Sequence, residues 1–179
     1  MKPGLIGLAV FAATTGFASP ALAADEALFD CPIEATTPAL AQRISDIVEP
    51  GNGIDDIGEP RTAELIAIVR KCALDHDLPQ AMLEPYALYY MARLTREETQ
   101  RRLEKLGIPL PAIQRAFDIG EGRSNQARLQ VTDAMADDLM TLLDAAGIDV
   151  STMEQSTLVL IGAYGRALSS EWHLRAQFD

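Results

Sequence analysis

The chain has 179 residues, of which 26 are acidic and 15 are basic, so its formal net charge is −11 at neutral pH. This excess of negative charge disfavours binding of nucleic acid or anionic lipid over the whole surface. The length suits one domain built around a single core.

The first 23 residues have the three parts of a secretory signal peptide. Lys2 gives a positive start, an uncharged apolar run covers residues 5–17, and small residues lead to Ala23 and Ala24, between which we expect cleavage. The run is shorter than the roughly 20 residues that a membrane span needs. The pattern predicts a single mature domain, residues 24–179, that is periplasmic or secreted from a bacterium and has no membrane span after cleavage.

Cys31 and Cys72 are the two cysteines of the chain. In an oxidising compartment such a pair is most simply a disulfide, and closing a loop of about 40 residues would stabilise the fold by about 4 kcal/mol. Two reactive thiols are the weaker alternative, because neither a Cys-x-x-Cys motif nor a basic cluster surrounds them. We therefore predict one disulfide.

The order of caps and breakers predicts an all-α bundle of about seven helices with no β-sheet. An acidic lead-in, residues 24–36, precedes the first helix, which begins at Pro38 with Thr37 as its cap. A second helix is expected from Pro60 to about Asp75.

Two helices are expected between residues 77 and 106. Asp77 caps the first of them, and Pro85 inside it should kink or restart the helix, because proline lacks a backbone donor. Thr95 with Glu98 forms a capping-box pattern, which predicts that a new helix begins there.

Three more helices complete the predicted bundle. A short helix covers about residues 110–118 and a long one covers residues 124–146. A second capping-box pattern at Ser151 predicts the start of the last helix. Gly162 and Gly165 in that helix should let a neighbouring helix approach closely.

A basic segment lies between Arg93 and Arg128, with eight basic and five acidic side chains in a chain that is otherwise strongly acidic. A solvated helix surface would explain it. The alternative is a face that binds an acidic protein or a small anionic ligand, through Arg96, Arg101, Arg102, Lys105 and Arg115.

Part of this segment, TQRRLEKLGIPLPAIQRAF, resembles a helix-turn-helix, with Gly107 in the turn and residues 110–118 as the reading helix. Leu103 stands where the motif prefers a small residue, and Arg102 stands where it prefers an apolar one. Export would also separate the domain from DNA, so we expect no nucleic-acid partner.

Two groups of polar residues are candidates for a metal site and for catalytic bases, and neither has the spacing that such a site requires. The loop over residues 49–60 has oxygen ligands of the kind that calcium prefers, but it lacks the spacing of an EF-hand. These ligands are Glu49, Asn52, Asp55, Asp56 and Glu59. His76 and His173 each lie near a carboxylate, yet neither has a zinc-binding spacing or an adjacent nucleophile motif. We therefore assign no catalytic residue, metal ligand or cofactor.

Tyr86, Tyr89 and Tyr90 lie close together after Pro85. Their helical spacing is typical of a core, but three neighbouring phenols should not all point inward. We expect at least one at the surface, where the group could line an apolar ligand groove.

Together these patterns predict an exported, acidic, helical protein that binds a partner or a small anionic or apolar ligand without catalysis. A small exported hydrolase, with a site assembled from distant residues such as His76 or His173, is the alternative from a different class. A helix-turn-helix DNA-binding protein is the third and is disfavoured by export.

Overall fold

The structure is a computed structural model that describes residues 26–47 and 59–178. In this part of the chain all the regular elements are helical and no strand is present, which confirms the all-α prediction. The predicted signal peptide, its cleavage site at Ala23 and Ala24, and most of the acidic loop 49–60 lie outside the described residues. Seven α-helices are described: α1 (Glu26–Glu34), α2 (Pro38–Ile47), α3 (Glu59–Asp75), α4 (Leu83–Lys105), α5 (Leu110–Ala116), α6 (Asp133–Ala145) and α7 (Gln155–Arg175).

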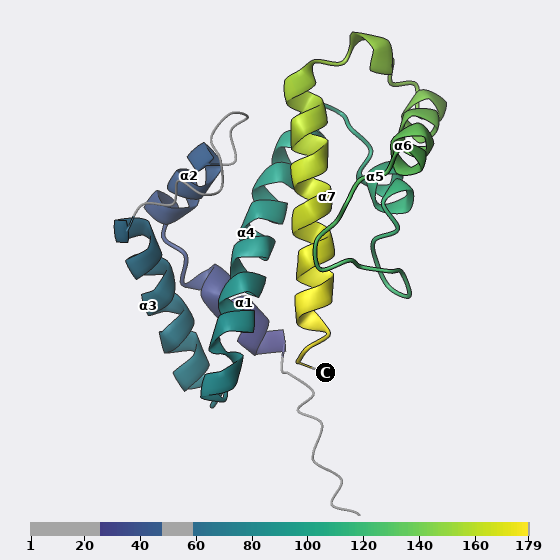
Figure 1. Cartoon of the computed structure of the whole chain (residues 1–179). Helices are drawn as coiled ribbons and strands as arrows, with labels where there is room; N and C mark the ends of the chain where they lie inside the picture. Colours follow the sequence, from purple (N-terminus) through teal and green to yellow (C-terminus); the bar gives the residue numbers. More distant parts are fainter. Residues whose placement is uncertain (1–25, 48–58, 179) are drawn as a thin grey trace, which may run out of the picture.

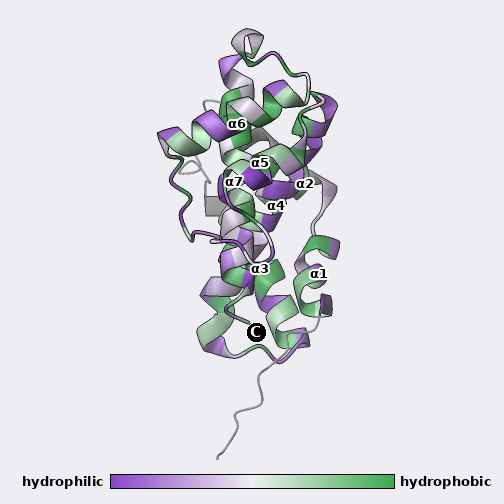
Figure 2. Ribbon diagram, turned by 90° about the vertical axis from the view of Figure 1, so that its right-hand side faces the viewer, coloured by the Kyte–Doolittle hydropathy of each residue, from purple (hydrophilic) through white to green (hydrophobic). Residues whose placement is uncertain are grey.

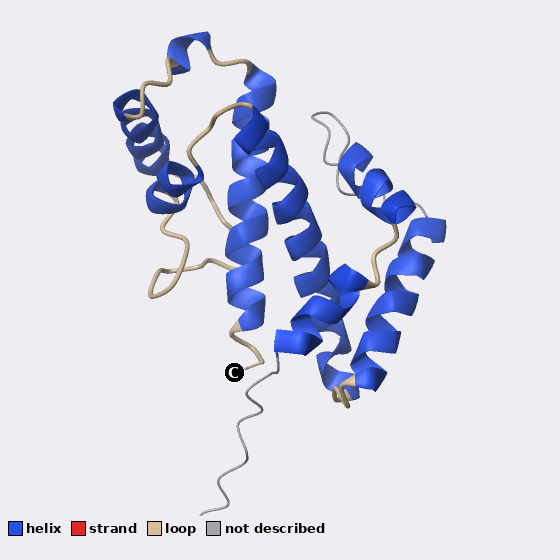
Figure 3. Ribbon diagram, turned by 180° about the vertical axis from the view of Figure 1, so that it is seen from behind, coloured by secondary structure: helices blue, strands red, loops and turns tan. Residues whose placement is uncertain are grey.

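The two longest helices, α4 and α7, run antiparallel and side by side through the middle of the molecule (Figures 1 and 3). Arg96 of α4 contacts Glu171 of α7 with two hydrogen bonds, of 2.8 and 3.3 Å. Figure 1 shows α1, α2 and α3 on one side of this central pair, and α5 and α6 on the other.

The buried apolar residues form two clusters that both include the central pair. The N-terminal cluster joins α1, α2 and α3 to the first half of α4 and to Phe178. The C-terminal cluster joins α5, α6 and the segment between them to Leu103 and to α7. Figure 2 shows polar and apolar residues mixed along the helices.

The predicted disulfide between Cys31 and Cys72 is present, with a sulfur–sulfur distance of 2.01 Å. It links α1 to α3. Next to it the ring of Phe29 packs against Tyr89, with centroids 4.8 Å apart, and against Phe178, at 5.4 Å. The C-terminal end of the chain is therefore held against α1.

The segment expected to be an irregular acidic lead-in contains α1. Nine residues with Pro32 inside would be a marginal helix in isolation, which is why the sequence did not predict it. The helix forms because Leu28 and Phe29 are buried in the N-terminal cluster and the disulfide anchors its last turn.

The two helices expected between residues 77 and 106 are one continuous helix, α4. Pro85 is its third residue, where the backbone donor has no partner within the helix, so the proline neither kinks nor restarts it. The capping-box pattern at Thr95 lies inside the helix, whose buried residues continue from Tyr86 to Leu103.

The helix expected over residues 124–146 begins only at Asp133, with Thr132 as its cap; the Thr132 hydroxyl accepts the Met135 N–H at 3.3 Å. The preceding segment is irregular, and Asn125 bonds both backbone groups of Gly120. Similarly, Ser151 does not cap α7. It lies in a short 3-10 turn, η3 (Val150–Thr152), and α7 begins at Gln155.

Candidate functional site

A cavity of about 630 Å³ opens between α4, α7 and the segment 127–129; we call it the α4–α7 groove. Helix α4 contributes Leu88, Met91, Ala92 and Thr95. The irregular segment contributes Ala127, Arg128 and Leu129. Helix α7 contributes Ala163, Arg166, Ala167, Ser170, His173, Leu174 and Gln177, the last of which lies just beyond its end.

Small residues on α7 leave room for this groove. Ala163 and Ala167 line it, where longer side chains would fill the space between α7 and its neighbours. On another face of the same helix, Gly165 lies against Phe117 and Leu129. A Cβ added at Gly165 would be only 2.5 Å from a ring carbon of Phe117, so the glycine sets how closely the C-terminal cluster packs on α7.

Two serines of α7 fix the position of the irregular segment that forms the third side of the groove. The buried Ser169 hydroxyl donates to the carbonyl of Gln126 at 2.7 Å, and the Ser170 hydroxyl donates to the carbonyl of Ala127 at 3.2 Å. These bonds satisfy backbone groups of an irregular segment that has no helical partners there. They position Arg128 and Leu129 beside α7.

The lining of the groove is apolar with a cationic part. Among the residues that the structure describes, Arg128, Arg166 and His173 are its basic side chains, and no aspartate or glutamate lines it. The whole chain has 26 carboxylates and 15 basic residues, so this composition is opposite to that of the molecule. A cavity lined by one sign of charge with apolar walls attracts ligands of the other sign.

The groove lies where the two apolar clusters meet. Met91 and Leu174 pack against the N-terminal cluster, whereas Leu129 belongs to the C-terminal cluster. Ligand sites in helical proteins are commonly formed between helices at such junctions.

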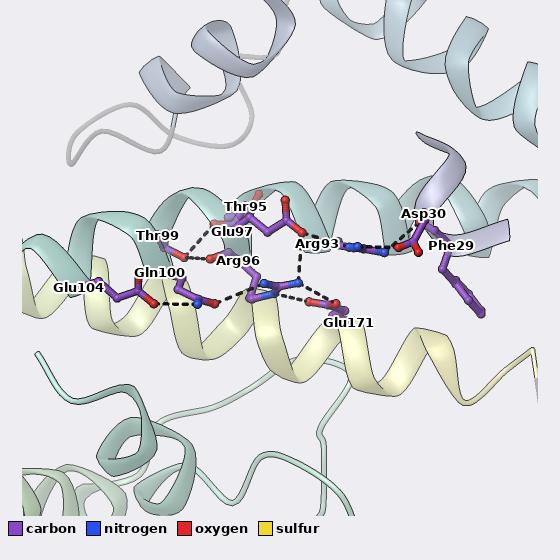
Figure 4. A network of polar contacts seen from close by, with 10 residues as sticks. All are labelled: Phe29, Asp30, Arg93, Thr95, Arg96, Glu97, Thr99, Gln100, Glu104 and Glu171. Carbon is purple, nitrogen blue, oxygen red and sulfur yellow. Dashed lines mark hydrogen bonds and ion pairs between the residues drawn. The ribbon is translucent and has the colours of Figure 1, made fainter. Parts of the chain in front are cut away.

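The predicted basic face is only partly available. Arg96 is bound to Glu171, and Arg93 is bound to Asp30 at 2.8 Å and to Glu97 at 3.1 Å (Figure 4). Burial alone would lower the pKa of Arg93, but its hydrogen bonds with Asp30 and Glu97 raise the pKa above the usual value. These two arginines connect helices and are not free to bind a partner.

Three other residues of the predicted face do come together. Arg101, Arg102 and Lys105 line a second cavity, of about 420 Å³, with Ser156 and Thr157 from the start of α7. Both arginines form ion pairs with Glu98 at 2.6 Å, and this carboxylate offsets part of the positive potential that they present to a ligand. Arg115 is exposed on α5 and does not line this cavity.

The three tyrosines predicted to line a groove are all buried, with at most 1% of their surface exposed. The expectation that one lies at the surface is wrong. The Tyr86 hydroxyl donates to the carbonyl of Leu28, and Tyr90 is hydrogen-bonded to Thr36. Helix α1, which the sequence did not predict, covers the side of α4 from which a phenol would otherwise have emerged.

The two histidines lie in different places. His173 lines the α4–α7 groove, and His76 lines a polar cavity beside the disulfide with Asp30 and Glu34. Ser170, the hydroxyl nearest to His173 in sequence, donates to a backbone carbonyl and not to the imidazole. Among the described residues no group of three or more His, Cys, Asp or Glu side chains could hold a metal ion.

The reading helix of the helix-turn-helix resemblance corresponds to α5, which has seven residues. Ala112, Ile113 and Ala116 of this helix are buried in the C-terminal cluster. The resemblance thus reflects a short helix that packs against α6.

Sequence reasoning missed the α4–α7 groove. In the sequence of α7, the side of the helix that lines the groove is marked by small residues at helical spacing, interspersed with basic ones. These residues are Ala163, Ala167 and Ser170, with Arg166 and His173. That pattern also fits an ordinary amphipathic helix. Arg128 is 38 positions from Arg166, and only the irregular path of residues 119–132 brings it to the same groove.

The fold and this groove define an all-α, disulfide-linked protein with a cationic apolar site. Comparisons with known protein families, with curated proteins and with solved structures found no match to the chain. None of the described helices combines the length and the apolar character that crossing a membrane requires.

Proposed function

We propose that this chain is exported by means of residues 1–23 and functions as a non-catalytic binding protein whose ligand occupies the α4–α7 groove. The observation that carries the proposal is the groove itself: about 630 Å³, with an apolar lining that includes two arginines and, in the part of the chain that the structure describes, no carboxylate. Small-molecule sites have volumes in this range and a few polar groups on mostly apolar walls.

Two further observations support a binding role. Leu88 is 52% exposed and Arg128 and Arg166 are also exposed, so the groove presents apolar and cationic groups to solvent. The disulfide agrees with an oxidising compartment. A hydrolytic role would need a nucleophile bonded to a base, and the hydroxyl of Ser170 is instead bonded to the carbonyl of Ala127.

The test is a native mass spectrum of the protein purified from the periplasm of an expressing bacterium. We expect a chain that starts at Ala24, with the disulfide formed, and a non-covalent mass retained under gentle conditions. Replacing Ala163, which lines the groove, by phenylalanine should strongly reduce the retained mass, because the ring would project into the groove and obstruct it. Ala145→Phe, at an exposed position of α6, is the matched control and should keep it.

Retention of the same mass by Ala163→Phe would remove the groove from the proposal. Turnover of a chromogenic ester, lost in His173→Ala, would replace the binding role with the hydrolytic one. An uncleaved chain in the periplasmic fraction would contradict export through a removed signal.

A further inference from the structure

The lining of the α4–α7 groove changes along its length. Because α4 and α7 are antiparallel and Arg96 meets Glu171, Leu88 at the start of α4 lies toward Leu174 at the end of α7. Arg166 lies two turns earlier on α7, toward the opposite end.

Arg128 belongs to the same end as Arg166. The bond from Ser170 to Ala127 and the contact of Leu129 with Gly165 show that residues 127–129 pass α7 between its residues 170 and 165. The groove therefore has two arginines toward one end, and Leu88, Met91 and Leu174 toward the other, where His173 and Gln177 also line it.

These arginines differ from most others in the chain. Arg43, Arg93, Arg96, Arg101, Arg102, Arg123 and Arg175 are all in ion pairs. Within the described residues, Arg128 and Arg166 have neither an ion pair nor a hydrogen bond from their guanidinium groups. Two unpaired guanidinium groups beside an apolar surface are suited to a carboxylate, which binds arginine through paired hydrogen bonds.

The dimensions favour a single extended chain. From Ala163 to Leu174 the helix rises about 17 Å, which sets the length of the groove along α7. A partner helix about 10 Å wide would occupy roughly 1,300 Å³ over that length. The groove has about 630 Å³, so such a helix would lie mostly outside it, whereas an alkyl chain would fit within it.

We propose that the groove binds a single-chain anionic amphiphile, an alkyl carboxylate, with its head group at Arg128 and Arg166 and its chain along Met91 and Leu88 toward Leu174. This inference depends on the proposed binding function and adds the class of ligand.

The experiment is isothermal titration calorimetry of the protein, freed of bound lipid, with decanoate, dodecanoate and dodecanol below their aggregation concentrations. Dodecanoate should bind at least tenfold more tightly than dodecanol, because only the carboxylate can form charge-assisted bonds. Removing two methylene groups, from dodecanoate to decanoate, should weaken binding by roughly tenfold or more.

Variants locate the head group. Arg166→Gln and Arg128→Gln should each weaken dodecanoate binding about tenfold and leave dodecanol binding unchanged. Arg115→Gln is the matched control, since Arg115 is exposed on α5 away from the groove, and it should change neither affinity. Circular dichroism of each variant shows that the fold is retained.

Equal binding of dodecanol and dodecanoate, or full dodecanoate affinity in both arginine variants, would overturn the anionic head group while leaving the groove as a binding site. Binding of an acidic helical peptide, or self-association, in place of any alkyl ligand would overturn the ligand class. The proposed function itself fails on a different result, namely retention of the native ligand by Ala163→Phe.

Discussion

At the scale of single residues, Gly165 determines how closely α7 and the C-terminal cluster approach each other. Its missing side chain is replaced by the ring of Phe117 and a methyl group of Leu129. Gly162, one turn earlier, has more room: a Cβ there would meet only the guanidinium of Arg166, at 3.5 Å. The expectation that both glycines allow a close approach is met at Gly165, and the neighbour there is a loop and a helix end.

Gly165→Ala should therefore destabilise the protein by about 1–3 kcal/mol, because Phe117 must shift in a packed core. Gly162→Ala is the matched comparison and should stabilise it by up to about 1 kcal/mol, through the helix propensity of alanine. Urea unfolding of both variants measures the difference. Equal changes in the free energy of unfolding for the two substitutions would show that the close contact with Phe117 does not exclude a side chain at Gly165.

At the scale of elements, α1 depends on tertiary contacts for its stability. Arg93 of α4 donates to the carbonyl of Phe29 at 3.0 Å and pairs with Asp30, and the guanidinium of Arg175 lies 4.7 Å from the centre of the Phe29 ring. Two helices, α4 and α7, thus hold one short helix. The disulfide adds a covalent link from α1 to α3.

Removing the disulfide by Cys31→Ser with Cys72→Ser should lower the free energy of unfolding by up to about 4 kcal/mol, given a separation of 41 residues between the cysteines. Reduction of the wild-type protein should have the same effect. Hydrogen exchange should then show α1 losing protection before α7. Simultaneous loss of protection in both helices would contradict a local role for the disulfide.

Local signals predicted some elements and failed at others for identifiable reasons. Thr37 does cap α2, where its hydroxyl accepts the Leu40 N–H at 3.1 Å, and Gly107 and Gly147 follow the ends of α4 and α6 with positive φ. The pattern Thr95-x-x-Glu98 is equally compatible with a helix interior. There Glu98 binds Arg101 and Arg102 instead of a cap.

The candidate site was less predictable than the fold. The basic residues were recognised from composition, but charge patterns do not reveal which arginines are paired inside the molecule, as Arg96 is with Glu171. A groove requires the relative placement of α4, α7 and an irregular segment. None of these placements has a local sequence signal.

At the scale of the whole molecule, the buried phenols link stability to alkaline pH. Burial raises the pKa of Tyr86, Tyr89, Tyr90 and Tyr164, which are all four tyrosines of the chain. Since the folded protein retains these protons longer than the unfolded chain, their contribution is fully present below pH 10 and is lost as the pH rises above it.

Stability should therefore fall steeply above about pH 10, by as much as about 1.4 kcal/mol per pH unit for each phenol that ionises only on unfolding. The near-ultraviolet absorbance of tyrosinate should rise only as the protein unfolds. In concentrated guanidinium all four phenols should titrate near pH 10. A phenol that titrates near its usual pKa in the native protein would contradict the burial of these side chains.

The two apolar clusters meet at α4 and α7, and the α4–α7 groove lies at that junction. A ligand there would contact both clusters, so binding should stabilise the molecule as a whole. The second basic cavity, lined by Arg101, Lys105 and Ser156, lies at the other end of the central pair and serves as an internal comparison.

The most direct test of the central claim is an amide chemical-shift titration of the protein with dodecanoate. We predict saturable shifts in residues 88–95, 127–129 and 163–177, with the largest near Arg128 and Arg166. Shifts confined to residues 101–106 and 156–160, or none at saturating concentrations, would contradict a ligand site in the α4–α7 groove.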